Sequence, residues 1–419
     1  MSSRSGLLRG IGTLAACGAG GGQGEVEPIS GAALAWQGGR IVWAGPESEL
    51  PDACAAESVR DAGGRVLEAG GGLVVPGLVD AHTHLAFAGW RAGELVERIR
   101  GKSYLEIARA GGGILSTVRA TRTASEEELL ERCRGFAWEM LSLGVTTVEG
   151  KSGYGLETET ELRLLRVYGR LAGEMPIRVI PTFLGAHVLP PEHASDRGAY
   201  VRLLLDEMLP AVAGEGLARF CDVFVEEGAF TIEEAREILE AARELGLGLK
   251  LHADQLTDGG GARLAAEVGA VSADHLEHVS AAGIEALEGS GTVAVSLPLA
   301  ALYLGQPSLP ARDLIEAGVP VAVATDFNPG SAPSYHLPLA MTLACLRQRM
   351  TPAEALKGAT IYAARAVGME DEIGSLEVGK AADFALIDAP GVETWLSHFR
   401  GNACRMTVVG GEIVWERGA

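Results

Sequence analysis

The chain has 419 residues, of which 47% are hydrophobic and 21% are charged, so its composition is that of a globular protein rather than a disordered one. This length suits one large domain with a smaller accessory domain. The formal net charge of −20 argues against nucleic acid and anionic membrane surfaces as partners, because both repel a strongly acidic protein.

The N-terminal residues raise the question of export. The stretch LAAC, which ends at Cys17, resembles a lipoprotein cleavage site, but Gly10 and Gly12 interrupt the apolar run before it. We therefore expect an ordinary first strand there. No apolar run reaches the roughly 20 residues of a membrane span, and the six cysteines are scattered without a CxxC pair, which is typical of a reducing cytoplasm.

Residues 1–70 are predicted to form the first part of a small β-domain, because Gly31–Pro46 reads as two short strands around a turn at Gly38-Gly39. The same pattern returns in residues 369–419, where strands flank a turn at Gly410-Gly411. The two ends of the chain are therefore predicted to pair in one β-sandwich domain beside the central part.

Between residues 71 and 368, short apolar runs alternate with longer helical patterns. Near-continuous apolar strands are typical of a parallel sheet that is covered on both faces. Eight strand–helix alternations predict an α/β fold, a (β/α)8 barrel of the TIM type, although periodicity alone leaves a doubly wound open sheet as an alternative. The predicted strands are Leu73–Val79, Val145–Val148, Arg178–Leu184, Cys221–Val225, Leu247–Leu251, Val271–Ala273, Thr292–Val295 and Val319–Ala324.

Two of the intervening helices have clear ends. Thr231 is placed as an N-terminal cap, with Glu234 three residues on, and Gly246 ends the helical pattern. The segment from Ser125 to Gly144 carries the same signals. A last helix, within residues 351–369, leads back to the β-domain.

Histidines and an aspartate follow several of the predicted strands. His82 and His84 stand two positions apart after the first strand, and such residues point to the same side of an extended segment. His252 follows the fifth strand, His275 the sixth and Asp326 the eighth. Imidazole suits zinc, iron and similar metals, and barrel enzymes place their catalytic groups at these strand ends.

Three histidines and one carboxylate would make a mononuclear metal site that leaves a position for water. The alternative is a set of unrelated polar residues at the starts of loops, since a pair such as His82 and His84 is by itself a weak signal. The metal site is favoured because these residues all follow strands of one alternating pattern.

Several motifs are similar to those of the metal-dependent amidohydrolase superfamily: PGLVDAHTHL, HAD, DH, ATDFNPG and GSLEVGKAADFALID. Within this superfamily, the chain resembles most closely the imidazolonepropionase family of histidine degradation. The stretches AGGGILSTV and KSGYGLETE carry the closer resemblance, which covers nearly the whole predicted barrel and is much weaker at the N-terminal end.

The resemblance implies that His82, His84, His252 and Asp326 hold one metal ion, zinc or iron. Such an ion lowers the pKa of its bound water toward about 7 and polarises the carbonyl that the water attacks. Asp326 is then expected to take the proton of the water and pass it to the leaving nitrogen. His275 is expected to stabilise charge at the attacked oxygen or to orient the water.

The resemblance also implies the substrate, 4-imidazolone-5-propionate, whose ring amide is opened by water to N-formimidoyl-L-glutamate. Arg91 is expected to bind the propionate, because an arginine fork suits a carboxylate. Gln255 stands where some family members carry Glu, so it can orient the ring but cannot act as an acid or base. Further substrate contacts are expected from Tyr104, Tyr154, His187, Asn328, Gly330 and Ser331, and the resemblance implies a homodimer.

Other interpretations are disfavoured by particular residues. Lys151 suggests a carbamylated lysine that bridges two metals, but its GKSGYG context matches the mononuclear family. Another cyclic amidohydrolase or a heterocycle deaminase is disfavoured by Arg91, Tyr154 and His187, which anticipate a ring that carries a carboxylate. An inactive scaffold protein is disfavoured because all of the expected metal ligands are present.

Overall fold

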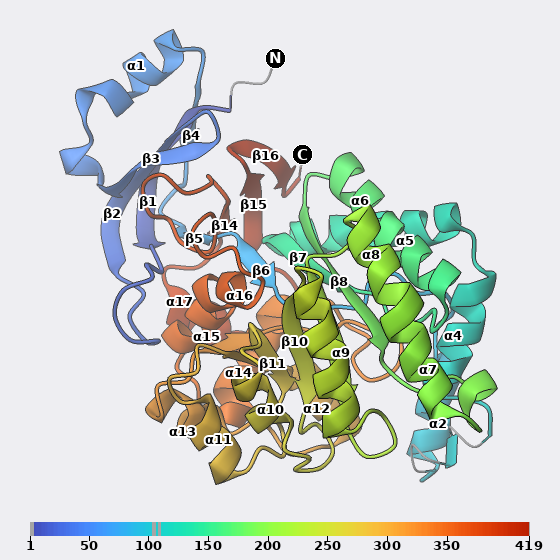
Figure 1. The fold of residues 1–419 in the computed structure, drawn as a ribbon. Helices are drawn as coiled ribbons and strands as arrows, with labels where there is room; N and C mark the ends of the chain where they lie inside the picture. The colour runs from blue at the N-terminus through green and yellow to red at the C-terminus, as the bar shows by residue number, and fades with distance from the viewer. Residues whose placement is uncertain (1–3, 103–105, 108–109, 419) are drawn as a thin grey trace.

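The computed structural model describes residues 4–102, 106–107 and 110–418, and two eight-stranded sheets organise it. One is a barrel of parallel strands with helices around it, and the other is a mixed sheet to which both ends of the chain contribute (Figure 1). The prediction of an α/β fold, with a (β/α)8 barrel and a small β-domain from both termini, is confirmed.

The barrel strands lie side by side in chain order, and every neighbouring pair is parallel. The first and last strands also meet, because Asp326 N donates to His82 O (3.0 Å) and His84 N donates to Phe327 O (2.9 Å). This order excludes the doubly wound sheet, in which the strand order reverses. The strands are β6 (Leu78–Asp80), β7 (Val145–Lys151), β8 (Arg178–Ala186), β9 (Phe220–Val225), β10 (Gly248–Ala253), β11 (Ser272–His275), β12 (Val293–Ser296) and β13 (Val321–Val323).

The helices around the barrel begin at the predicted caps. Ser125 and Thr231 each accept a hydrogen bond from the backbone N–H three residues on, and the glutamate there completes a capping box. Gly144 and Gly246 follow the helix ends with positive φ. None of the described helices is both long enough and apolar enough to cross a membrane. The helices are α2 (Ala92–Ile99), α4 (Ile114–Thr123), α5 (Glu126–Ser142), α6 (Thr158–Glu174), α7 (Arg197–Leu203), α8 (Leu209–Glu215), α9 (Ile232–Glu244), α10 (Gly261–Glu267), α11 (Ala281–Leu287), α12 (Pro298–Leu304), α13 (Ala311–Glu316), α14 (Leu337–Gln348), α15 (Pro352–Gly358) and α16 (Ile361–Ala366).

The first predicted strand, Leu73–Val79, is in fact two strands. β5 (Leu73–Pro76) pairs with strands of the mixed sheet, whereas β6 belongs to the barrel. The chain passes from one sheet to the other at Gly77, where a Cβ would overlap the Thr146 side chain. The prediction of a single strand was wrong. Both strands are fully buried, so the sequence shows one continuous apolar run across the break.

The mixed sheet has the strand order β16-β15-β14-β5-β1-β2-β3, and β4 also pairs with β1. Both predicted turns are present, and Gly38, Gly39, Gly410 and Gly411 all have positive φ. The stretch before Cys17 forms the predicted first strand. The elements of this domain are β1 (Gly6–Ala15), β2 (Pro28–Gln37), β3 (Arg40–Pro46), β4 (Arg65–Glu68), β14 (Phe384–Ile387), β15 (Cys404–Val409) and β16 (Glu412–Glu416), with helices α1 (Ala56–Asp61) and α17 (Val392–Ser397).

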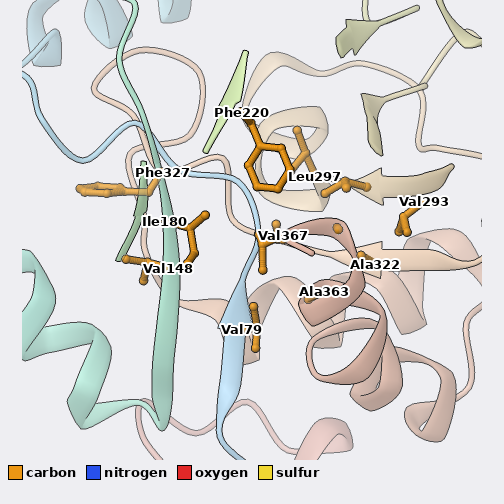
Figure 2. Packing of buried hydrophobic residues seen from close by; sticks show 14 of the residues in the cluster. Val79, Val148, Ile180, Phe220, Val293, Leu297, Ala322, Phe327, Ala363 and Val367 are labelled. Atoms are coloured by element: carbon orange, nitrogen blue, oxygen red, sulfur yellow. The ribbon is translucent and has the colours of Figure 1, made fainter. Parts of the chain in front are cut away.

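The amino-terminal end of the barrel is closed by apolar packing. Figure 2 shows Val79 close to Val367 and Ala363, and all three side chains are fully buried. Val79 N also donates a hydrogen bond to Ala359 O (2.9 Å), just before α16. Because this end is filled, the carboxyl ends of the strands are where the barrel can hold a reactive site.

Candidate metal centre

Five polar side chains meet at the carboxyl ends of four barrel strands. His82 and His84 follow β6, His252 lies on β10, His275 ends β11, and Asp326 follows β13. One ligand atom from each of His82, His84 and His252 lies within 4.8 Å of the others, and the same holds for His82, His275 and Asp326. All five residues are at most 3% exposed. The structure therefore brings these predicted residues together in one buried cluster.

Two aspartates orient two of the imidazoles. His82 Nδ1 lies 2.6 Å from Asp274 Oδ2, and His252 Nδ1 lies 3.0 Å from Asp222 Oδ1. With its Nδ1–H donated to a carboxylate, a neutral imidazole keeps the Nε2 lone pair for a metal. The Nε2 atoms of both histidines are buried and have no hydrogen-bond partner among the described residues. This donor set fits a transition metal.

Lys151, at the end of β7, lies beneath this cluster and is fully buried. Its Nζ atom is 2.6 Å from Asp222 Oδ2 and 3.1 Å from both Asp274 Oδ2 and Glu149 Oε2. An ammonium group suits three surrounding carboxylates, whereas a carbamate would add a fourth negative charge. The geometry thus favours an ordinary lysine and a single metal centre.

The imidazoles of the cluster differ in their affinity for protons. Burial lowers the pKa of His252 to about 4 and that of His187 to about 3. At His82, burial acts in the same direction, but the carboxylates of Asp274 and Asp326 outweigh it and raise the pKa to about 9. A bound metal would thus meet a neutral ligand at His252, whereas binding at His82 would require that imidazole to lose a proton.

The backbone adopts rarely populated conformations at three strand ends. The φ angle is 83° at His275, 55° at Asp326 and 49° at Asp254. Non-glycine residues seldom occupy this region, because Cβ approaches a backbone carbonyl. Asp254 is held there by Gly261 N (2.9 Å to Oδ1) and Ala262 N (2.9 Å to Oδ2). Such conformations concentrate at functional sites, where surrounding contacts impose them.

Arg91 lies at the start of α2 and pairs with Glu94. Its Nε and Nη2 atoms donate to Glu94 Oε2 (3.0 and 2.8 Å), and its side chain is 7% exposed. Glu94 Oε1 in turn accepts from Gly113 N (2.7 Å), in the AGGGILSTV stretch. A Cβ at Gly330 would overlap the Arg91 guanidinium. The predicted carboxylate-binding residue is thus packed directly against the loop that follows Asp326.

Tyr154 and His187 lie against the histidine cluster. The His187 ring stacks on the His84 ring with centroids 5.4 Å apart, and the Tyr154 ring lies 5.7 Å from each of them. The loop that carries Tyr154 is shaped by Glu161, whose carboxylate accepts the N–H groups of Gly153, Gly155 and Leu156 at 2.7–2.9 Å. Both predicted contacts therefore border the candidate metal centre.

The loop after Asp326 is tied together by Asn328. Asn328 Oδ1 accepts from Gly330 N and Ser331 N (both 2.8 Å), and Nδ2 donates to Asp326 O (2.7 Å) and Ser331 Oγ (2.8 Å). Ser331 Oγ lies 3.4 Å from Asp326 Oδ2. The Asn328 amide is therefore used inside its own loop, where it shapes the surroundings of Asp326.

Gln255 is half-buried in the loop after His252. This loop is fixed by Glu226, whose Oε2 accepts from Leu256 N (2.8 Å) and whose Oε1 accepts from Thr257 Oγ1 (2.5 Å). The remaining predicted substrate contact, Tyr104, lies outside the described residues.

Three carboxylates at the centre were missed by sequence reasoning. Asp222 interrupts the otherwise apolar strand β9, and a buried charge in such a strand was the available signal. Asp274 directly precedes His275 in β11, and this position beside a predicted site residue was its signal. Glu277 carries no comparable signal, yet it is 7% exposed and its Oε2 lies 3.5 Å from His275 Nδ1. Asp222 and Asp274 orient imidazoles of the cluster, whereas Glu277 lies near His275 without a hydrogen bond to it.

Comparison with known proteins shows the family to which this chain belongs. Residues 73–414 match the model of the amidohydrolase family. The chain is 48% identical to the imidazolonepropionase of Shouchella clausii over 94% of this chain and 88% of that protein. It is 53% identical to the imidazolonepropionase of Symbiobacterium thermophilum over 86% of this chain and 85% of that protein.

Solved structures share the fold at much lower identity. An adenosine deaminase from Xanthomonas campestris with bound zinc has a TM-score of 0.68 at 20% identity, covering 97% of this chain and 92% of its own. A 5-methylcytosine deaminase from Klebsiella pneumoniae has a TM-score of 0.75 at 16% identity, covering 99% and 98%. At such identities these structures support the fold alone.

Proposed function

Because the chain belongs to the imidazolonepropionase family of amidohydrolases, we propose that it hydrolyses the ring amide of 4-imidazolone-5-propionate to N-formimidoyl-L-glutamate, a step of histidine degradation. The observation that carries this proposal is the buried cluster in which His82 and His252 turn their Nε2 atoms away from the aspartates that hold Nδ1. That arrangement suits a hydrolase with a metal-activated water.

We assign His82, His84, His252 and Asp326 as the ligands of one metal ion, zinc or iron. When bound, the ion supplies a water of lowered pKa, toward about 7, and polarises the carbonyl under attack. The oxygen Asp326 Oδ1 lies 3.4 Å from His82 Nε2 and 3.5 Å from His84 Nε2, so these side chains converge on one point.

Asp326 is the proposed proton carrier. Burial raises the pKa of Asp326, but the charges of His82 and the other nearby imidazoles outweigh it, so the pKa lies below the ordinary value and the group starts as a carboxylate. A carboxylate can accept the proton of the attacking water and pass it to the ring nitrogen that leaves. A potential ligand atom of His275 lies within 4.8 Å of one of Asp326. We assign His275 to stabilise charge on the attacked oxygen.

Arg91 is the proposed anchor of the propionate group. Glu94 takes two of the five N–H donors of a guanidinium, and this contact fixes the plane of the fork. An oriented arginine binds a carboxylate in two hydrogen bonds. We propose that Tyr154 and His187 contact the ring and that Gln255 orients it without moving protons. A heterocycle deaminase is not favoured, because a simple nucleobase carries no carboxylate for Arg91.

The test is an ultraviolet assay of 4-imidazolone-5-propionate consumption by the purified protein, under anaerobic conditions and with added zinc or ferrous iron. We expect turnover that a chelator abolishes and that one of the two metals restores. Elemental analysis of the same preparation identifies the bound metal. The absence of turnover with either metal would refute the proposed activity, and a chain that binds no metal would point to an inactive scaffold.

We also propose that the protein is a cytoplasmic homodimer. All six cysteines are unpaired thiols, which supports a reducing compartment. The dimer is supported by the family resemblance alone. Light scattering after size-exclusion chromatography should give twice the chain mass of 43.6 kDa, and a single chain mass would contradict it.

A further inference from the structure

We propose that Lys151 is a positioning residue of the metal centre. Its ammonium group holds Asp222 and Asp274 together, so that each carboxylate keeps one histidine, His252 or His82, with Nε2 directed to the metal. This inference rests on the proposed metal site but not on the identity of the substrate.

Two series of contacts lead from the Lys151 ammonium group to the proposed metal ligands. Lys151 Nζ donates to Asp222 Oδ2 (2.6 Å), and Asp222 Oδ1 accepts from both Nδ1 (3.0 Å) and the backbone N–H (3.1 Å) of His252. On the other side, Asp274 Oδ2 lies 3.1 Å from Lys151 Nζ and 2.6 Å from His82 Nδ1. Each aspartate therefore bridges the lysine and one proposed metal ligand.

The barrel explains why these three residues meet. Lys151 is on β7, Asp222 on β9 and Asp274 on β11. Inward side chains from alternate strands of such a barrel form one layer. This layer is fully buried, so its charges are poorly screened by water and each carboxylate depends on a nearby cation.

A second buried lysine, Lys250, makes different direct contacts and provides a matched comparison. Lys250 is also fully buried, but it donates to Glu149 Oε2 (2.8 Å) and to the carbonyl of Ala366 (3.1 Å). Lys250 thus pairs with Glu149, whose Oε2 also lies 3.1 Å from Lys151 Nζ, whereas Lys151 is the lysine that directly contacts both aspartates. Without Lys151, the two carboxylates would repel each other and would no longer be held against the imidazoles.

Zinc affinity tests this role, measured on apoprotein by competition with a chromophoric chelator in the absence of substrate. Lys151→Met should weaken zinc binding by about 10-fold to 100-fold, the usual loss when a group that orients a ligand is removed. Lys250→Met, the matched control, should retain zinc affinity within about 3-fold, although it also removes a buried charge. The visible spectrum of the cobalt(II)-loaded protein should change in Lys151→Met and not in Lys250→Met.

Lys151→Gln serves if Lys151→Met does not fold, because glutamine keeps an N–H donor but no charge. Unchanged zinc affinity in a folded Lys151 variant, or an equal loss in Lys250→Met, would overturn the inference. So would a wild-type protein that binds no zinc or cobalt. A wild-type protein that binds zinc but does not consume 4-imidazolone-5-propionate would refute the proposed activity while leaving this inference intact.

Discussion

At the residue scale, we expect Arg91 to distinguish between substrates. A metal ion held by the histidine cluster would activate water for many cyclic amides, so the cluster does not by itself select one substrate. Arg91 adds a guanidinium whose orientation is set by Glu94 and whose position is set by the absence of a side chain at Gly330. A substrate with a carboxylate at the matching distance from its ring amide would then be both bound and aligned.

Arg91→Met is expected to raise KM by about 100-fold with a smaller change in kcat, because a charge-assisted contact of about 3 kcal/mol is lost. Steady-state kinetics with 4-imidazolone-5-propionate measures both constants. Arg100→Met is the matched control, since the Arg100 side chain is 69% exposed and pairs with Glu97 on the surface. An unchanged KM in Arg91→Met would show that the carboxylate is held elsewhere.

At the scale of elements, the junction between β5 and β6 joins the two sheets. The chain leaves the mixed sheet at Pro76 and enters the barrel at Leu78, and Gly77 N donates to Asp383 O (2.9 Å) on the way. The side chain of Thr146, on the neighbouring strand β7, fills the space where a Cβ of Gly77 would stand. Glycine is therefore required by close packing, not by its φ angle.

Gly77→Ala should lower the free energy of unfolding by about 1–3 kcal/mol, because an added methyl group forces strands apart in a packed core. Gly135→Ala is the control, since Gly135 lies inside α5 and a Cβ there would meet open space. That change should raise stability by up to about 1 kcal/mol through helix propensity. Thermal unfolding of the metal-loaded proteins gives the comparison, and equal melting temperatures for Gly77→Ala and wild type would speak against this account.

At the scale of the whole molecule, Asp383 connects the barrel to the mixed sheet. Its Oδ2 accepts from Arg178 Nη2 (2.9 Å) at the start of β8, and its Oδ1 accepts from Gly410 N (2.7 Å) in the turn before β16. Its carbonyl accepts from Gly77 N. One residue, 3% exposed, thus holds three segments that are distant in the sequence.

Asp383→Ala is expected to destabilise the protein by about 2 kcal/mol, because Arg178 and Gly410 both lose an acceptor. Glu215→Gln, which weakens an exposed pair with Arg166, should cost less than about 1 kcal/mol. Zinc affinity should be unchanged in both variants, because Arg178 lies at the amino-terminal end of β8 and the metal centre at the carboxyl ends. Thermal unfolding and chelator competition measure the two effects, and a loss of zinc affinity in Asp383→Ala would contradict this separation.

Much of the fold followed from local patterns. Capping boxes at Ser125 and Thr231 act within three residues, so they were visible in the sequence and the structure contains both. The proposed ligands were visible because each follows an apolar strand, and parallel strands of one barrel carry their ends to one face. The break at Gly77 was hidden, because two different sheets bury the segment on either side of it.

The sequence by itself determined the alternation of strands and helices, their caps, and which side chains could bind a metal, because these depend on residues close together in the chain. Only the tertiary structure decided how the candidate metal centre is held. Asp274 reaches His82 across 192 residues, and Lys151 reaches Asp222 across 71. Such contacts depend on which strands are neighbours and on the layer in which each side chain lies, and no local pattern of residues contains that information.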